Sequence, residues 1–175
     1  LFLYAKYLFD SITFRAYPWK VMSPSWNITA GAAVLAAWLG TYGGNAKIHI
    51  VAFHHYRGTW YLGYDDVALD AYVAAATANA PGKEIWCSEV GDSAPTVEKL
   101  WRSHLYAAAK GVNRMMWYCY DLAAGRGEMR LTYYEGLAEA YAQMITQCAG
   151  ASVGYVNKAK TGAVGASLDG TPVLY

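Results

Sequence analysis

The chain has 175 residues, of which 55% are hydrophobic and 15% charged, and its formal net charge is +1. This apolar content argues against a disordered chain, and the lack of long charge runs argues against a nucleic-acid-binding stripe or a polybasic membrane patch. The longest apolar run, from Ala30 to Leu39, is much shorter than the ~20 residues that a membrane span needs.

Short apolar runs alternate with longer helical patterns through most of the chain. The predicted strands are WKVM (19–22), KIHIVAF (47–53), EIWCS (84–88) and VNRMMWYCY (112–120). The predicted helices cover about 30–40, with Thr29 as its cap, 65–79, 97–108 and 134–148. After Gly150 the texture changes to small residues, glycines and an Asp-Gly hairpin signal. We therefore predict two domains, 1–149 and the truncated start of a β-sandwich-like accessory domain at 150–175.

Strand and helix repeated in this way predict an α/β fold with a parallel sheet. An open doubly wound sheet and half of a (β/α)₈ TIM barrel both fit. No glycine-rich phosphate loop follows a predicted strand, which gives a nucleotide-binding fold little support. A complete barrel takes ~250 residues, so this chain would supply strands five to eight and their helices.

Composition leaves several properties open. The three cysteines (Cys87, Cys119 and Cys148) are too few and scattered for a disulfide framework or zinc motif, so we expect buried free thiols. The chain opens on LFLY without a methionine or basic region, so no signal peptide is visible, and we expect a piece of a longer protein. Secretion and oligomeric state stay open. The seven Trp and sixteen Tyr suit sugars, whose C–H faces stack on aromatic rings.

Polar and aromatic residues gather where the predicted strands end. In parallel α/β sheets chemistry concentrates at the carboxyl ends of strands. The segments at these ends are Ser23-Pro24-Ser25-Trp26-Asn27 after strand one, His54-His55-Tyr56 after strand two, Glu89 after strand three, and Trp117 through Asp121 at strand four. Glu89 closes the run IWCSEVG, and an ionised carboxylate is costly to bury unless it is paired or has chemical work.

Strict alternation along the strands predicts which side chains share a face. Glu89 would share a face with Ile85 and Cys87, while Trp86 and Ser88 would face the helices. On the preceding strand His54 and Tyr56 would share a face with Ile48, Ile50 and Ala52. The tyrosine hydroxyl would then reach Glu89 and keep the carboxylate ionised, as a nucleophile requires.

The set KVMSPSWN, IVAFHHY, IWCSEVG and NRMMWYCYD resembles the last four strands of the (β/α)₈ clan of retaining β-glycoside hydrolases, in particular its β-xylosidase-like and cellulase-like members. The resemblance covers about residues 1–148. It implies that Glu89 is the catalytic nucleophile and that His54, Tyr56 and Trp117 line the sugar site. Asp121, Trp26 and Asn27 are further substrate-binding candidates. A carbohydrate substrate is implied; no cofactor, metal, nucleic acid or membrane span is.

One departure from the clan's pattern concerns the second carboxyl. The clan's acid/base glutamate follows an asparagine, and this chain has no Asn-Glu pair. Retaining hydrolysis needs two carboxyls ~5 Å apart. We therefore expect the acid/base residue in a segment before Leu1, and we expect the isolated chain to be inactive.

Several simpler interpretations compete with a catalytic site. Glu89 could be a structural carboxylate paired with Arg114 or Lys83, and His54 with Tyr56 a core pair. Adjacent histidines on a strand point to opposite faces, which disfavours a metal site from His54, His55 and Cys119. We expect His49, His55 and His104 to be structural, and Glu128 and Arg126 to bind sugar or pair with Asp121. A non-catalytic carbohydrate-binding or scaffold barrel, and a metal-dependent barrel hydrolase, are the alternative functions.

Overall fold

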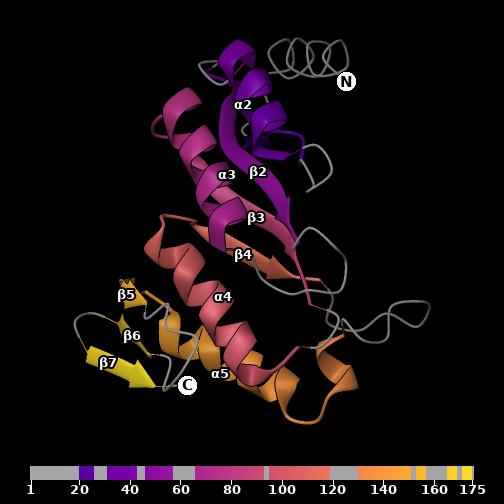
Figure 1. The fold of residues 1–175 in the computed structure, drawn as a ribbon, viewed down its shortest axis with the longest axis vertical. Coiled ribbons are helices and arrows are strands. Elements are labelled where there is room, and N and C mark those ends of the chain that lie inside the picture. Colours follow the sequence, from indigo (N-terminus) through magenta and orange to yellow (C-terminus); the bar gives the residue numbers. More distant parts are fainter. Residues whose placement is uncertain are drawn as a thin grey trace.

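The computed structural model describes residues 20–25, 31–42, 46–56, 66–92, 95–118, 130–150, 153–156, 165–168 and 171–174. Within these residues strands alternate with helices as far as Cys148, and three short strands follow (Figure 1). No helix in the described part of the chain is long and apolar enough to cross a membrane.

Four parallel strands form the larger sheet. They are β1 (Val21–Met22), β2 (Ile48–His55), β3 (Glu84–Val90) and β4 (Arg114–Trp117), and they lie in sequential order. The predicted α/β fold with a parallel sheet is thus confirmed. β2 and β3 each extend two residues beyond their predicted ends, so His54 and Glu89 belong to the sheet itself. Side chains on a strand are held more rigidly than side chains on a loop.

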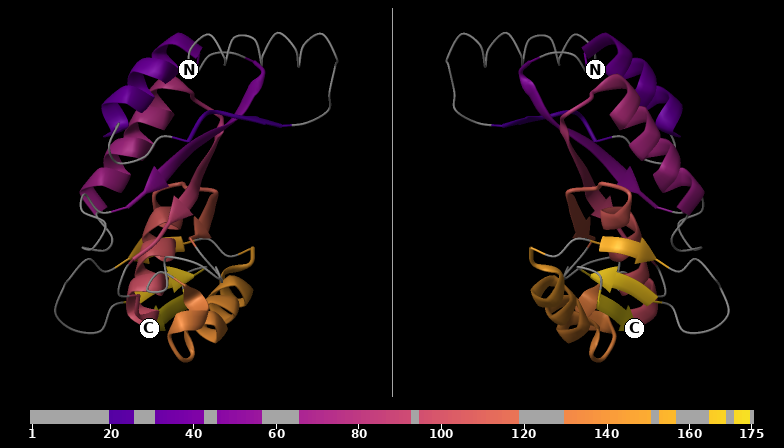
Figure 2. Two further views of the ribbon diagram at one scale, coloured as in Figure 1. Left: turned by 90° about the vertical axis from the view of Figure 1, so that its right-hand side faces the viewer. Right: turned by 90° about the vertical axis from the view of Figure 1, so that its left-hand side faces the viewer.

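The described helices are α2 (Gly31–Tyr42), α3 (Asp66–Asn79), α4 (Val97–Ala109) and α5 (Leu137–Cys148), with a 3₁₀ turn η2 (Leu131–Tyr133) before α5. α2 and α3 lie side by side along the sheet (Figure 2). α4 begins where Thr96 Oγ1 accepts a hydrogen bond from the Lys99 amide at 3.2 Å. It ends before Gly111, whose φ of +90° an L side chain rarely adopts.

The two faces of the parallel sheet differ in their contacts. On one face, called the helix face here, Phe53 of β2 stacks on Tyr72 of α3 with ring centroids 4.8 Å apart. Cys87 of β3 is 0% exposed in the same core, which also includes Trp101 and Leu105 of α4. The opposite face, called the open face, carries exposed Met22 and Met116. Apolar burial on the helix face therefore positions the strands that bear the candidate site.

A β-bulge interrupts the alternation of β3. Phe53 pairs with Cys87 but His54 pairs with Glu89, and on the other side Cys87 pairs with Met115 while Val90 pairs with Trp117. The ladder with β2 thus skips Ser88, and the ladder with β4 has one extra residue on β3 between Cys87 and Val90. Ser88 is therefore the extra residue of the bulge.

The predicted side-chain faces of β3 are wrong because of this bulge. Ile85 and Cys87 pack in the helix-face core, whereas Ser88 bonds to Ser25. Glu89 follows Ser88 onto the open face, where it pairs with His54. Trp86 likewise lies on the open face, under the Arg114 guanidinium at 4.9 Å from its ring centroid.

The last three strands form a separate antiparallel sheet. β5 (Val153–Val156), β6 (Gly165–Leu168) and β7 (Thr171–Leu174) pair in that order. Val153 packs against the core beside α4. That these strands begin an accessory domain at 150–175, and that the parallel sheet is half of a barrel, stay predictions.

Candidate functional site

Glu89 lies at the carboxyl end of β3 with its side chain between two groups of β2. The Tyr56 hydroxyl donates a hydrogen bond to Glu89 Oε1. The Nδ1 atom of His54 lies 3.5 Å from Glu89 Oε2. The contact between Tyr56 and Glu89 that the sequence predicts at one end of the sheet is therefore present, and each carboxylate oxygen faces a different partner.

Tyr56 is suited to act as a permanent hydrogen-bond donor. The residue is 8% exposed. Burial, and next the hydrogen bond to Glu89, raise the pKa of the Tyr56 phenol well above its usual value. The hydroxyl therefore keeps its proton at physiological pH and serves as a hydrogen-bond donor to the Glu89 carboxylate.

The two neighbouring histidines of β2 have different environments. The side chains of His54 and Glu89 are 28% and 29% exposed, so both are open to a ligand. His55 is completely buried on the helix face opposite Val90. This confirms that His54 and His55 point to opposite faces, as expected for consecutive residues of a strand.

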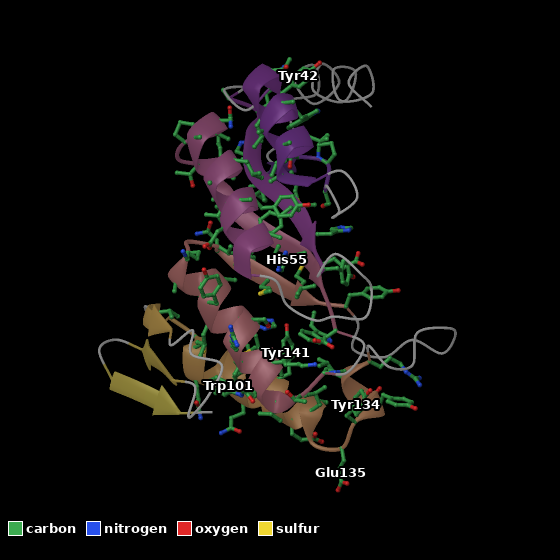
Figure 3. All side chains as sticks on the ribbon, viewed as in Figure 1. Tyr42, His55, Trp101, Tyr134, Glu135 and Tyr141 are labelled. Atoms are coloured by element: carbon green, nitrogen blue, oxygen red, sulfur yellow. The ribbon has the colours of Figure 1, made fainter. Side chains whose placement is uncertain are left out.

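Trp117 does not accompany Glu89 on the open face. It packs against the helix-face core, with its ring centroid 6.1 Å from that of His104 on α4. The His104 ring in turn lies edge-on to Tyr141 of α5, at 5.5 Å, so that Tyr141 is next to α4 (Figure 3). The placement of Trp117 beside the carboxylate is thus wrong, because β4 turns this residue toward α4 and α5. Its role in sugar binding is untested.

Tyr118 belongs to the strand-four end, Trp117 through Asp121, that the sequence predicts at this edge, but the sequence reasoning did not single it out as a site residue. Its amide donates to the Val90 carbonyl at 2.7 Å, which ties it to the residue after Glu89. Its phenol is close enough to Tyr56 to contribute to the raised pKa of that group. Tyr118 is half-buried and lies in the bend that directly follows β4. Its place next to Trp117, at the carboxyl end of this strand, is the sequence signal that could have identified it.

Three predicted binding residues lie outside the described residues. These are Trp26, Asn27 and Asp121; Cys119, Arg126 and Glu128 lie outside them as well. Their predicted roles are untested.

The alternative that Glu89 is a structural carboxylate paired with Arg114 is not supported, because no ion pair joins these two side chains. Arg114 stacks on Trp86, and in the described part of the chain the Glu89 side chain meets Tyr56 and His54. The described residues also contain no group of three or more His, Cys, Asp or Glu side chains suited to a metal ion.

His104 has the structural role that the sequence predicts. Its Nδ1 donates to the Leu100 carbonyl at 2.8 Å, and burial lowers the pKa of the imidazole to about 4. The ring is therefore neutral at physiological pH, and it supports Trp117 from the helix side.

A cavity of about 730 Å³ lies away from Glu89, between α4, β4 and α5. Its lining is mostly apolar and sulfur-containing, and it includes Met115, Met144 and Cys148. Among the described residues its lining includes His104 and Arg114 but no carboxylate, and Glu89, His54 and Tyr56 are not part of it.

No protein-family model and no curated protein matches this chain. The fold and the site define an α/β protein in which a hydrogen-bonded carboxylate, a phenol and an imidazole meet at the carboxyl edge of a parallel sheet.

Proposed function

We propose that the protein is the C-terminal half of the (β/α)₈ barrel of a retaining β-glycoside hydrolase, with Glu89 as the nucleophile. The observation that carries the proposal is the convergence of Tyr56 and His54 on the two oxygens of Glu89. Neither partner bears a fixed charge. A carboxylate held by such groups keeps more of its nucleophilicity than one neutralised by a lysine or arginine.

The arrangement of the parallel sheet supports the barrel part of the proposal. The strands follow one another in sequence order, without the reversal that marks a doubly wound sheet. All-parallel sheets are normally covered on both faces, and here Met22 and Met116 are 40% and 39% exposed on the open face. Closure with four further strands would enclose these side chains.

The proposed reaction has two displacement steps. A Glu89 oxygen attacks the anomeric carbon while the glycosidic C–O bond breaks, and the leaving oxygen takes a proton from the acid/base carboxyl. Water then attacks the same carbon, gives its proton to that carboxyl, and releases Glu89. Tyr56 donates to the carboxylate before attack and after release. We propose that the acid/base carboxyl comes from a segment preceding Leu1.

The proposed sugar environment on this half of the barrel is the open face. The half-exposed imidazole of His54 is suited to bind a sugar hydroxyl close to Glu89, and Tyr118 offers a ring for stacking. Trp117 would support the site from the helix face of the sheet, through its packing on His104, without contacting the sugar.

Covalent trapping tests the proposal. The full-length form of the protein is treated with 2-fluoro-glycosides, and the labelled peptide is identified by mass spectrometry. We expect an ester on Glu89. A label on any other residue contradicts the nucleophile assignment. Sugar binding without a label favours the alternative of a non-catalytic carbohydrate-binding barrel.

A further inference from the structure

Ser88, the extra residue of the β3 bulge, directly precedes Glu89. A bulge leaves one residue of the strand outside the regular pairing, and such residues often re-aim a neighbouring side chain. Here the pairs Phe53–Cys87 and His54–Glu89 are consecutive on β2 but are separated by Ser88 on β3. The bulge therefore lies at the point where β3 passes from a core residue to the candidate nucleophile.

The Ser88 hydroxyl is held from two sides. Its Oγ atom lies 3.3 Å from the Phe53 carbonyl oxygen and 2.8 Å from Ser25 Oγ. A carbonyl can only accept, and a serine hydroxyl has one proton to give. Ser88 therefore donates to Phe53 and accepts from Ser25, so that the three groups form one directed chain across the open face.

Ser25 is itself fixed, because the segment after β1 is tied to β2. The Ser23 amide donates to the Ile50 carbonyl at 2.9 Å, and Ser23 Oγ accepts from the Ala52 amide at 2.9 Å. Ser23 is 1% exposed. Its side chain thus takes the place of a backbone partner and fixes the chain two residues before Ser25.

From these contacts we propose that Ser88 is a positioning residue for Glu89, with Ser25 as its support, an inference that rests on the proposed function of Glu89. The hydroxyl chain Ser25–Ser88–Phe53 fixes the bulge, and the bulge fixes the direction in which Glu89 leaves the strand. The carboxylate is thereby presented to the Tyr56 hydroxyl and to His54 in a single orientation. Holding a reacting group in the required geometry can account for a large share of a rate.

A spectroscopic measurement tests the positioning independently of activity. The ¹³C carboxyl chemical shift of Glu89 is measured in the full-length protein and in S88A, S25A, S88T and S103A. Ser103 is the matched control, because its buried hydroxyl bonds within α4 to the Leu100 carbonyl. We expect the Glu89 signal to move in the same direction in S88A and S25A, and to stay in S88T and S103A. An unmoved signal in S88A overturns the proposal.

The trapping reaction then connects the positioning to chemistry. We expect S88A and S25A to form the covalent label about 10-fold more slowly with an unchanged affinity for the trap, and S88T to recover the rate. The double variant should be no slower than either single variant, because both act through one chain of hydrogen bonds. Additive losses, or a loss of affinity alone, overturn the proposal. If the wild-type protein forms no label, the proposed function is wrong. The carboxyl chemical shifts of the variants then still test whether Ser88 positions Glu89.

Discussion

The two ends of β3 each carry a glutamate, and their surroundings differ in kind. At the amino end Glu84 accepts hydrogen bonds from Lys20 and from the Trp86 indole, and the Lys20 hydrogen bond is the main cause of its lowered pKa. At the carboxyl end Glu89 meets a phenol and an imidazole. One strand thus holds a carboxylate that is paired with a lysine and another whose partners carry no permanent charge. Under the proposed function, it is this difference in partners that separates a structural carboxylate from a nucleophile.

Exchanging each glutamate for glutamine is the strongest test of this comparison. We expect E89Q in the full-length protein to lower the rate of glycoside hydrolysis by at least about 10³-fold, because the amide cannot form the ester intermediate. E84Q, the matched control five residues away on the same strand, should keep activity within a few fold. Equal losses in both variants would show that the two ends are not functionally different.

Substitutions of Trp117 and Tyr118 compare a residue that packs in the core with a residue proposed to contact the sugar. We expect W117A to lower the free energy of unfolding by about 3 kcal/mol, because its ring packs in the core between α4 and α5. Y118A should cost much less stability but weaken sugar binding, as measured by calorimetry. A W117A variant with unchanged stability but weakened sugar binding would instead indicate that Trp117 contacts the sugar.

The support from α4 is expected to depend on pH through His104. Its pKa is lowered to about 4 in the folded protein, so the unfolded chain binds a proton first as pH falls. Stability should be unaffected above the unfolded pKa of about 6.5 and should decrease by up to about 3 kcal/mol toward pH 4. Urea unfolding of wild type and H104Q between pH 7 and 4 measures this, and parallel curves would contradict it.

The hydrogen bond from Tyr56 is expected to have a smaller effect than Glu89 itself. We expect Y56F to slow label formation on Glu89 by about 10-fold to 100-fold, since a hydrogen bond to a charged group contributes about 1.5–3 kcal/mol. H49F is a matched control on the same strand, because His49 accepts from the Val21 amide, away from Glu89. An unchanged labelling rate in Y56F would show that the phenol does not prepare the nucleophile.

The smallest effect is expected at the amino end. K20M removes the lysine partner of Glu84, whose side chain is 34% exposed, and exposed ion pairs contribute little to stability. We expect the melting temperature to fall by no more than a few degrees, with catalysis unchanged. A large loss of activity would mean that this ion pair, too, shapes the site.

The sequence predicted the strands, the helices and the meeting of Tyr56 with Glu89, because hydrophobic periodicity and parallel strand order bring strand ends together. It did not predict which face Cys87 and Trp117 occupy. Assigning alternate residues to alternate faces, starting from Glu89, fails at the bulge. No residue type around Ser88 indicates that the strand contains an extra residue there. It also predicted β4 as 112–120, whereas the strand covers Arg114–Trp117. Asn113 explains the late start, because its side-chain oxygen accepts from the Ile85 amide in place of a backbone partner.

The bulge has a consequence for how this strand would respond to the loss of a residue. Deleting a single residue at most positions of β3 would move every side chain on one side of the deletion to the opposite face of the sheet. Ser88 is different, since without it Cys87 and Glu89 would become neighbours and keep their present pairs, Phe53 and His54. A strand without this residue would therefore keep the backbone pairing of Glu89 with His54, but it would lose the bulge and the Ser25–Ser88–Phe53 hydrogen bonds that hold the carboxylate in its present orientation.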